Sequence, residues 1–112
     1  MRFDKELLDD LTRQAKENPR LRQNLDLRTS PADTSQRMLN AMEPETVVPI
    51  HRHTTTTETV AVIRGKIKQC MYDSEGNETE TFIAGPGEDC VGFSVPVGVW
   101  HRSISLESGT VI

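Results

Sequence analysis

The sequence contains few aromatic residues and only two cysteines. Phe, Trp and Tyr make up 4% of the 112 residues, so a hydrophobic core must consist mainly of Val, Ile, Leu and Met. Cys70 and Cys90 have neither the density of a disulfide scaffold nor the CxxC spacing of a metal or redox motif. We therefore expect two buried free thiols in a reducing cytoplasm.

Long apolar runs and a strong excess of one charge are also missing. No stretch has the apolar length needed to span a bilayer, and the chain does not begin with the apolar segment of a secretion signal. The formal net charge is −4 with both signs interspersed, whereas nucleic-acid binding requires a basic face. We expect a cytoplasmic protein with neither a nucleic acid nor a membrane as its partner.

A length of 112 residues corresponds to a single domain. Residues 1–19 are predicted to form an N-terminal amphipathic helix that packs on the remainder, residues 20–112. Asp4 is the predicted N-cap, and the helix should end before Pro19, because a residue that precedes proline is disfavoured in the helical region. The apolar residues at helical spacing are Leu7, Leu8, Leu11 and Ala15.

Short strand patterns separated by Gly- and Pro-containing turns follow the helix. The predicted strands cover residues 21–27, 36–42, 47–53, 58–64, 66–72, 79–83, 91–95 and 100–106. A last strand begins at Thr110, and we expect it to be incomplete at residue 112, as in a truncated chain. Strands of this length and spacing predict an all-β sandwich or closed barrel.

The three histidines of the chain and one glutamate form a candidate metal site. His51 and His53 are two residues apart in a predicted strand, so both imidazoles face the same side. Glu58 shares a strand face with valines, where a carboxylate is costly unless it is paired or bound to a cation. His101 follows a Pro-x-Gly turn at the start of another strand. Each residue alone would more often be a hydrogen-bonded core residue or an exposed one, but together they predict one metal-binding site.

The predicted ligands restrict the metal only in part. Three imidazoles and one carboxylate leave two positions on an octahedral ion but complete a tetrahedral one. The expected cofactor is one divalent ion, with Fe, Mn, Ni, Co and Zn all compatible. Each imidazole should also donate its second N–H to an acceptor, for which Ser103, Ser105 and the threonines at 54–57 are candidates.

The spacing of these residues resembles the two cupin motifs. His51-x-His53, Glu58 and Gly65 are similar to the first motif, and Pro96-x-Gly98-x-x-His101 is similar to the core of the second. Glu45 and Cys90 stand where these motifs usually begin with glycine. The resemblance implies a cupin barrel, a jelly-roll-like double-stranded β-helix, in which His51, His53, Glu58 and His101 hold the metal.

A closer resemblance, to WbuC-type cupin-fold metalloproteins, covers nearly the whole chain. It includes the leading helix and the segments 30–31, 36–41, 43–44, 51–53, 96–101 and 106–111. That resemblance implies a connection with the biosynthesis of surface polysaccharide, the O-antigen of lipopolysaccharide. It implies no particular reaction.

Three functions are compatible with these residues. The first is an isomerase or epimerase acting on a sugar or sugar-nucleotide intermediate, with the metal as Lewis acid, although no further histidine is present as general base. The second is a metal-dependent dioxygenase. The third is a non-catalytic protein that binds a small molecule, an anion among the candidates, through some of its arginines. The candidate arginines are Arg22, Arg37, Arg52, Arg64 and Arg102.

Substrate contacts are predicted near the second strand. Gln36 and Asn40 share a face with Met38 and Met42, so the amides would line a pocket if this face points inward; a structural hydrogen-bonding role is the alternative. Arg37 is the third candidate for substrate binding. Catalytic residues stay unassigned, and we expect a homodimer, because small sheets often bury their edge strands against a second copy.

Overall fold

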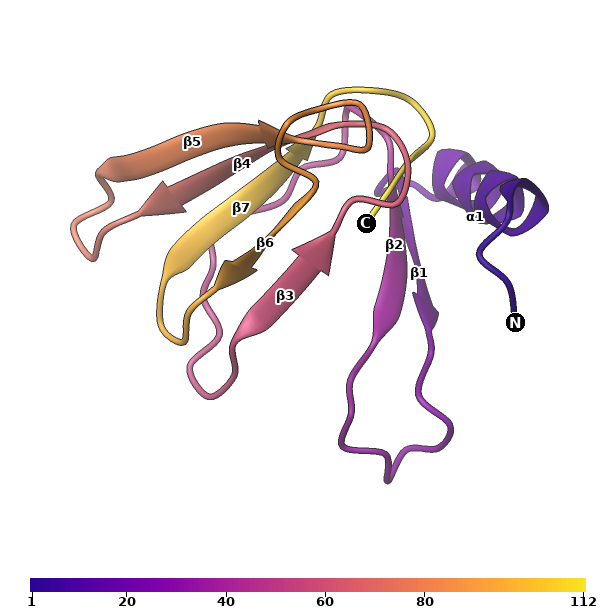
Figure 1. Ribbon diagram of the computed structural model, residues 1–112, viewed down its shortest axis with the longest axis horizontal. Coiled ribbons are helices and arrows are strands. Elements are labelled where there is room, and N and C mark those ends of the chain that lie inside the picture. The colour runs from indigo at the N-terminus through magenta and orange to yellow at the C-terminus, as the bar shows by residue number, and fades with distance from the viewer.

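A computed structural model describes residues 1–112 and contains mostly β-strands with one helix, as the sequence predicts (Figure 1). The elements are α1 (Lys5–Glu17), β1 (Arg22–Asp26), β2 (Met38–Met42), β3 (Glu58–Ala61), β4 (Ile67–Tyr72), β5 (Glu78–Ala84), β6 (Gly92–Val95), β7 (Trp100–Ser105) and β8 (Thr110–Val111).

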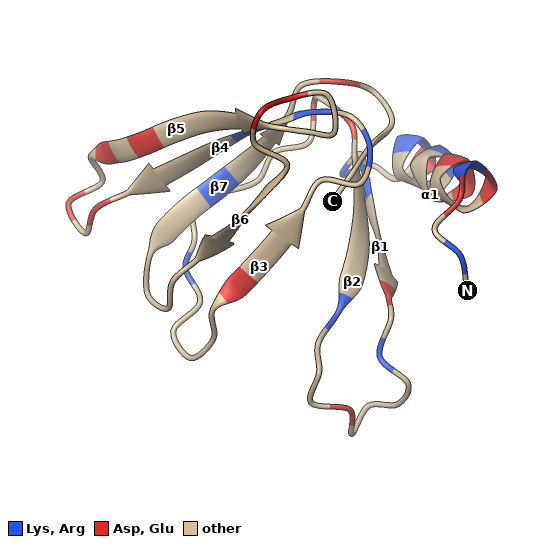
Figure 2. Ribbon diagram, viewed as in Figure 1, with Lys and Arg blue, Asp and Glu red and all other residues tan.

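Helix α1 has the predicted ends. The Asp4 carboxylate accepts a hydrogen bond from the Leu7 N–H at 3.0 Å, and Asn18, the residue before Pro19, is the C-cap. Charges of both signs lie on the exposed side of the helix (Figure 2). The helix is too short and too polar to cross a membrane.

The strands form three antiparallel groups: β1-β2-β8, β3-β6 and β5-β4-β7. Single bridges, His51 with His101 and Arg64 with Val111, extend two of these groups. The groups do not form one continuous ladder, and no closed barrel is present. In Figure 1, β1 and β2 stand beside α1, while β3 to β7 form the other part of the molecule.

One predicted strand is almost absent. Residues 47–53 were expected to pair as a strand, but only His51 makes a bridge, with His101. Pro49 lies in this segment and has no N–H to donate to a ladder, which explains why the pairing does not continue. Both cysteines are free thiols, as predicted; Cys70 is buried as predicted, whereas Cys90 is only half-buried.

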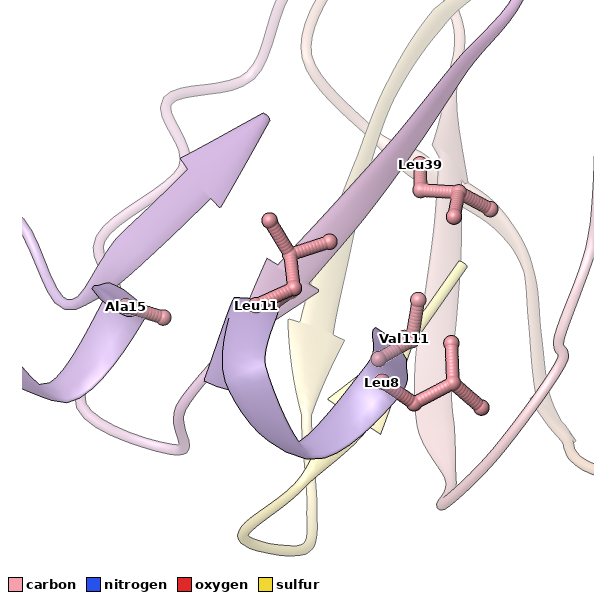
Figure 3. Packing of buried hydrophobic residues seen from close by; sticks show 6 residues of the cluster. Leu8, Leu11, Ala15, Leu39 and Val111 are labelled. Carbon is pink, nitrogen blue, oxygen red and sulfur yellow. The ribbon is translucent and has the colours of Figure 1, made fainter. Parts of the chain in front are cut away.

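The main apolar core lies between α1 and the β1-β2-β8 sheet. Figure 3 shows Leu8 and Leu11 of the helix close to Leu39 of β2 and Val111 of β8. Arg64 reinforces this contact, because its guanidinium donates to the Gly109 carbonyl, to Asp9 and to Thr12. The helix therefore covers the outer face of the sheet whose other residues line the site described below.

We expect Leu11→Ala to lower the free energy of unfolding by about 2–4 kcal/mol, because Leu11 is only 4% exposed and its removal leaves a cavity under the helix. Urea denaturation measures this change. Lys16→Ala is the control on the exposed side of the same helix and should stay within about 0.5 kcal/mol of the unsubstituted protein. Equal effects of the two substitutions would contradict the proposed docking of α1.

Candidate metal centre

The four predicted ligands lie together. The candidate ligand nitrogens of His51, His53 and His101 are all within 4.8 Å of one another. The two Glu58 carboxylate oxygens lie 3.0 Å from His53 Nε2 and 3.6 Å from His101 Nε2. The three histidines are therefore close enough to hold one metal ion, with Glu58 at its edge.

Backbone pairing places His51 beside His101. The His51 N–H donates to the His101 carbonyl at 3.0 Å, and the His101 N–H donates to the His51 carbonyl at 2.8 Å. Residues paired in this way in an antiparallel ladder direct their side chains to the same face. The imidazole centroids of the two residues are consequently 4.3 Å apart.

The turn before β7 positions the third histidine. Val99 donates to the Pro96 carbonyl at 3.2 Å, and Gly98 adopts a φ of +82°, which a residue with a side chain rarely adopts. The Gly98 N–H donates to the His53 carbonyl at 2.8 Å. The turn that precedes His101 therefore also fixes the backbone of His53.

Backbone carbonyls select the tautomers of two imidazoles. His51 Nδ1 lies 2.9 Å from the Pro49 carbonyl oxygen, and His101 Nδ1 lies 2.9 Å from that of Val99. A carbonyl can only accept, so Nδ1 carries the proton and Nε2 keeps its lone pair. These acceptors differ from the side chains that we expected from the sequence.

The expected acceptors have other partners. Ser103 donates to the Gln69 amide oxygen, and Ser105 donates to the Glu107 carbonyl. Both hydroxyls lie on the same strand as His101. The alternation of side chains along that strand predicts that they face the same side as His101, but it does not predict their hydrogen-bond partners.

Two ring nitrogens of the site have no hydrogen-bond partner, although the Glu58 carboxylate lies beside both. Nε2 of His53 and Nε2 of His101 are buried and make no hydrogen bond. Burial lowers the pKa of His101, so its ring is neutral at neutral pH. Because Nδ1 carries the single ring proton, Nε2 presents its lone pair to the Glu58 carboxylate. An imidazole lone pair and a carboxylate that face each other favour a cation between them, and these residues fit a divalent metal.

The site opens into a cavity of about 950 Å³. Its lining is mostly polar and comes from β1 and β2 on one side and from β3, β7 and the histidine segment on the other. Gln36 and Asn40 line it together with Met38 and Met42, so the face that these four residues were predicted to share points inward, which the sequence had left open. Clefts of this volume hold small molecules.

Arg37 does not lie at this cavity. Its guanidinium donates to the carbonyls of Ser35 and Leu27 and to Asp33, because an odd-numbered residue here faces away from Gln36 and Asn40. Arg22 is the only one of the five candidate arginines that lines the cavity. Arg20, which the sequence did not single out because it precedes the strand, lines it as well.

The comparisons with known proteins give a family but no function. A family described as a domain of unknown function, DUF6016, matches residues 3–84. The match includes His51, His53 and Glu58, and His101 lies beyond it. Neither the curated proteins nor the solved structures contain a match.

We expect Gly98→Ala to lower the free energy of unfolding by about 1–2 kcal/mol, because a side chain at φ +82° strains the turn that holds His53 and His101. The added methyl would meet no atom within 4 Å, so backbone strain is the whole effect. Gly87→Ala is the matched control, since its site is equally open but its φ is not positive. An equal loss of stability in both variants, measured by urea denaturation, would refute this explanation.

Proposed function

Because the chain belongs to the DUF6016 family, which has no known function, we propose one from its own site: the protein binds a divalent metal ion through His51, His53, Glu58 and His101. The observation that carries this proposal is the group of convergent imidazoles, two of which have a buried and unpaired Nε2. Hydrogen bonds from Nδ1 to backbone carbonyls support it further, because they direct the lone pairs of His51 and His101 to Nε2.

A cupin fold of the WbuC type is part of this proposal. Antiparallel strand groups on both sides of the histidine site support a jelly-roll-like fold, although these groups are not closed into a barrel. Gly65, which closes the first cupin-like motif, has a φ of +85°, and a Cβ there would collide with the Thr110 side chain. Glycine is therefore required at this position for the same two reasons, turn and close approach, that make it typical of the motif.

A hydroxylated small molecule is the proposed ligand, with a sugar or sugar-nucleotide intermediate of surface-polysaccharide synthesis as the candidate class. The cavity beside the histidines supports this choice, because amides and hydroxyls make up much of its lining. When bound, the metal would supply Lewis-acid polarisation of a ligand oxygen. The chain itself offers no further general base, since Glu58 is the only carboxylate in the lining. We therefore propose metal-assisted ligand binding and assign no catalytic residue.

Metal content tests the ligand set. Purified protein should contain about one divalent ion per chain by inductively coupled plasma mass spectrometry, and His51→Ala and His101→Ala should each weaken metal binding by at least ~100-fold. Glu58→Gln should weaken it less, because it removes the charge of one ligand and keeps the shape. Glu80→Gln, an exposed substitution on β5, is its matched control and should have no effect. Full metal content in both histidine variants would overturn the proposed site.

Chelation gives an independent prediction. Because the metal would bind only the folded chain, free metal at 100 times its dissociation constant should stabilise the protein by about 2.7 kcal/mol relative to chelator-treated protein. Urea denaturation with and without the added ion measures the difference. The His101→Ala variant should show no such stabilisation, and an equal response in both proteins would place the metal elsewhere.

A further inference from the structure

Two arginines at the cavity have no partner. Of the nine arginines in the sequence, seven contact a carboxylate, an aromatic ring or a tyrosine hydroxyl. Arg20 and Arg22 make no salt bridge and no side-chain hydrogen bond, and they are also the two arginines that line the cavity. Both of the unpaired arginines are thus at the cavity, where one ligand could contact the two guanidinium groups.

The residues that line the cavity offer no free carboxylate that could neutralise these two arginines. Glu58 is the only acidic residue of the lining, and its carboxylate already lies beside His53 and His101. The lining contributed by β1 and the turn before it therefore has two guanidinium groups and no negative charge. A concave surface with charge of one sign attracts oxyanions, and a guanidinium can bind phosphate or carboxylate with two parallel hydrogen bonds.

The backbone between the two arginines is strained and firmly held. Leu21 has a φ of +56°, the only positive φ at a residue other than glycine, and this backbone conformation is unfavourable for a residue with a Cβ. Its N–H donates to the Asn18 carbonyl, and its carbonyl accepts hydrogen bonds from the Glu43 N–H at 3.0 Å and the Thr46 hydroxyl at 2.6 Å. Such strain persists where surrounding contacts impose it, and it is concentrated at ligand sites.

Neutral polar groups continue the lining from the arginines toward the histidines. Asn24 of β1 and Asn40 of β2 are paired in register, and both side chains line the cavity. Ser103 lines it two residues after His101 and donates its proton to the fully buried Gln69 amide, so its oxygen presents lone pairs to the cavity. Groups of this kind bind hydroxyls.

We propose that Arg20 and Arg22 bind the phosphate or carboxylate group of a hydroxylated small molecule whose hydroxyl-bearing part extends toward the histidines. The ligand class is therefore that of sugar phosphates and sugar acids. The orientation toward the histidines rests on the proposed function, whereas the anion site rests only on the two arginines and the lining around them.

Calorimetric titration with glucose 6-phosphate, glucuronate and uncharged glucose tests the proposal. At least one of the two anions should bind at least tenfold more tightly than glucose, and the stronger of the two distinguishes phosphate from carboxylate recognition. Arg22→Gln, which replaces a half-buried cation, should weaken the binding of that anion by about 10- to 100-fold, because a hydrogen bond to a charged group is lost. Arg20→Gln should have a smaller effect, since Arg20 is exposed.

Arg28→Gln provides the matched control, because it removes the same charge from the other end of β1, where Arg28 pairs with Asp26 outside the cavity. It should leave the affinity for the anion unchanged. The proposal is overturned if neither anion binds more tightly than glucose, or if Arg22→Gln and Arg28→Gln give the same affinity as the unsubstituted protein.

Titrations of chelator-treated and metal-supplemented protein separate the two proposals. Loss of anion binding in Arg22→Gln with full metal content would support the anion site and leave the metal site intact. Anion binding that depends on Arg22 in a protein that takes up no metal would refute the proposed function alone.

Discussion

The reciprocal backbone pair between His51 and His101 is the interaction on which the site depends. It joins a segment that is otherwise without strand pairing to β7, and it is the reason that two residues fifty positions apart direct their imidazoles to one point. The Gly98 turn adds His53 through a third backbone hydrogen bond. Three main-chain hydrogen bonds therefore bring all the histidines of the chain together. Loss of any one of these hydrogen bonds would move the histidine side chains apart.

The arginines of the chain fall into two groups, one with structural contacts and one that lines the cavity. Arg64 holds helix α1 to the turn before β8, and Arg52 lies over the Trp100 ring with its guanidinium carbon 4.7 Å from the centroid. Arg20 and Arg22, by contrast, have no such role and face the cavity. In a chain with an overall negative charge, two unpaired arginines on one concave surface form a local positive patch that is suited to an anion.

Local patterns in the sequence were sufficient to predict the helix and most of the strands. The N-cap at Asp4 and the helix end before Pro19 follow from short-range rules, and both are confirmed. Strand alternation also predicts that Gln36 and Asn40 share a face, but only the structure shows that this face lines the cavity. The predicted side-chain acceptors of the His51 and His101 N–H groups were wrong, and the positive φ of Leu21 and the position of Arg20 at the cavity were not predicted at all. These features depend on how the main chain turns or on contacts across the fold, about which residue type and spacing contain no information.

The acceptors for His51 and His101 are carbonyls of the main chain, at Pro49 and Val99, and this has a consequence for variation among related sequences. A side-chain acceptor can be lost by a single substitution, whereas every residue type has a backbone carbonyl. The orientation of both rings should therefore tolerate changes in the lining of the cavity. Ligand preference can diversify in this scaffold while the arrangement of the imidazoles stays the same.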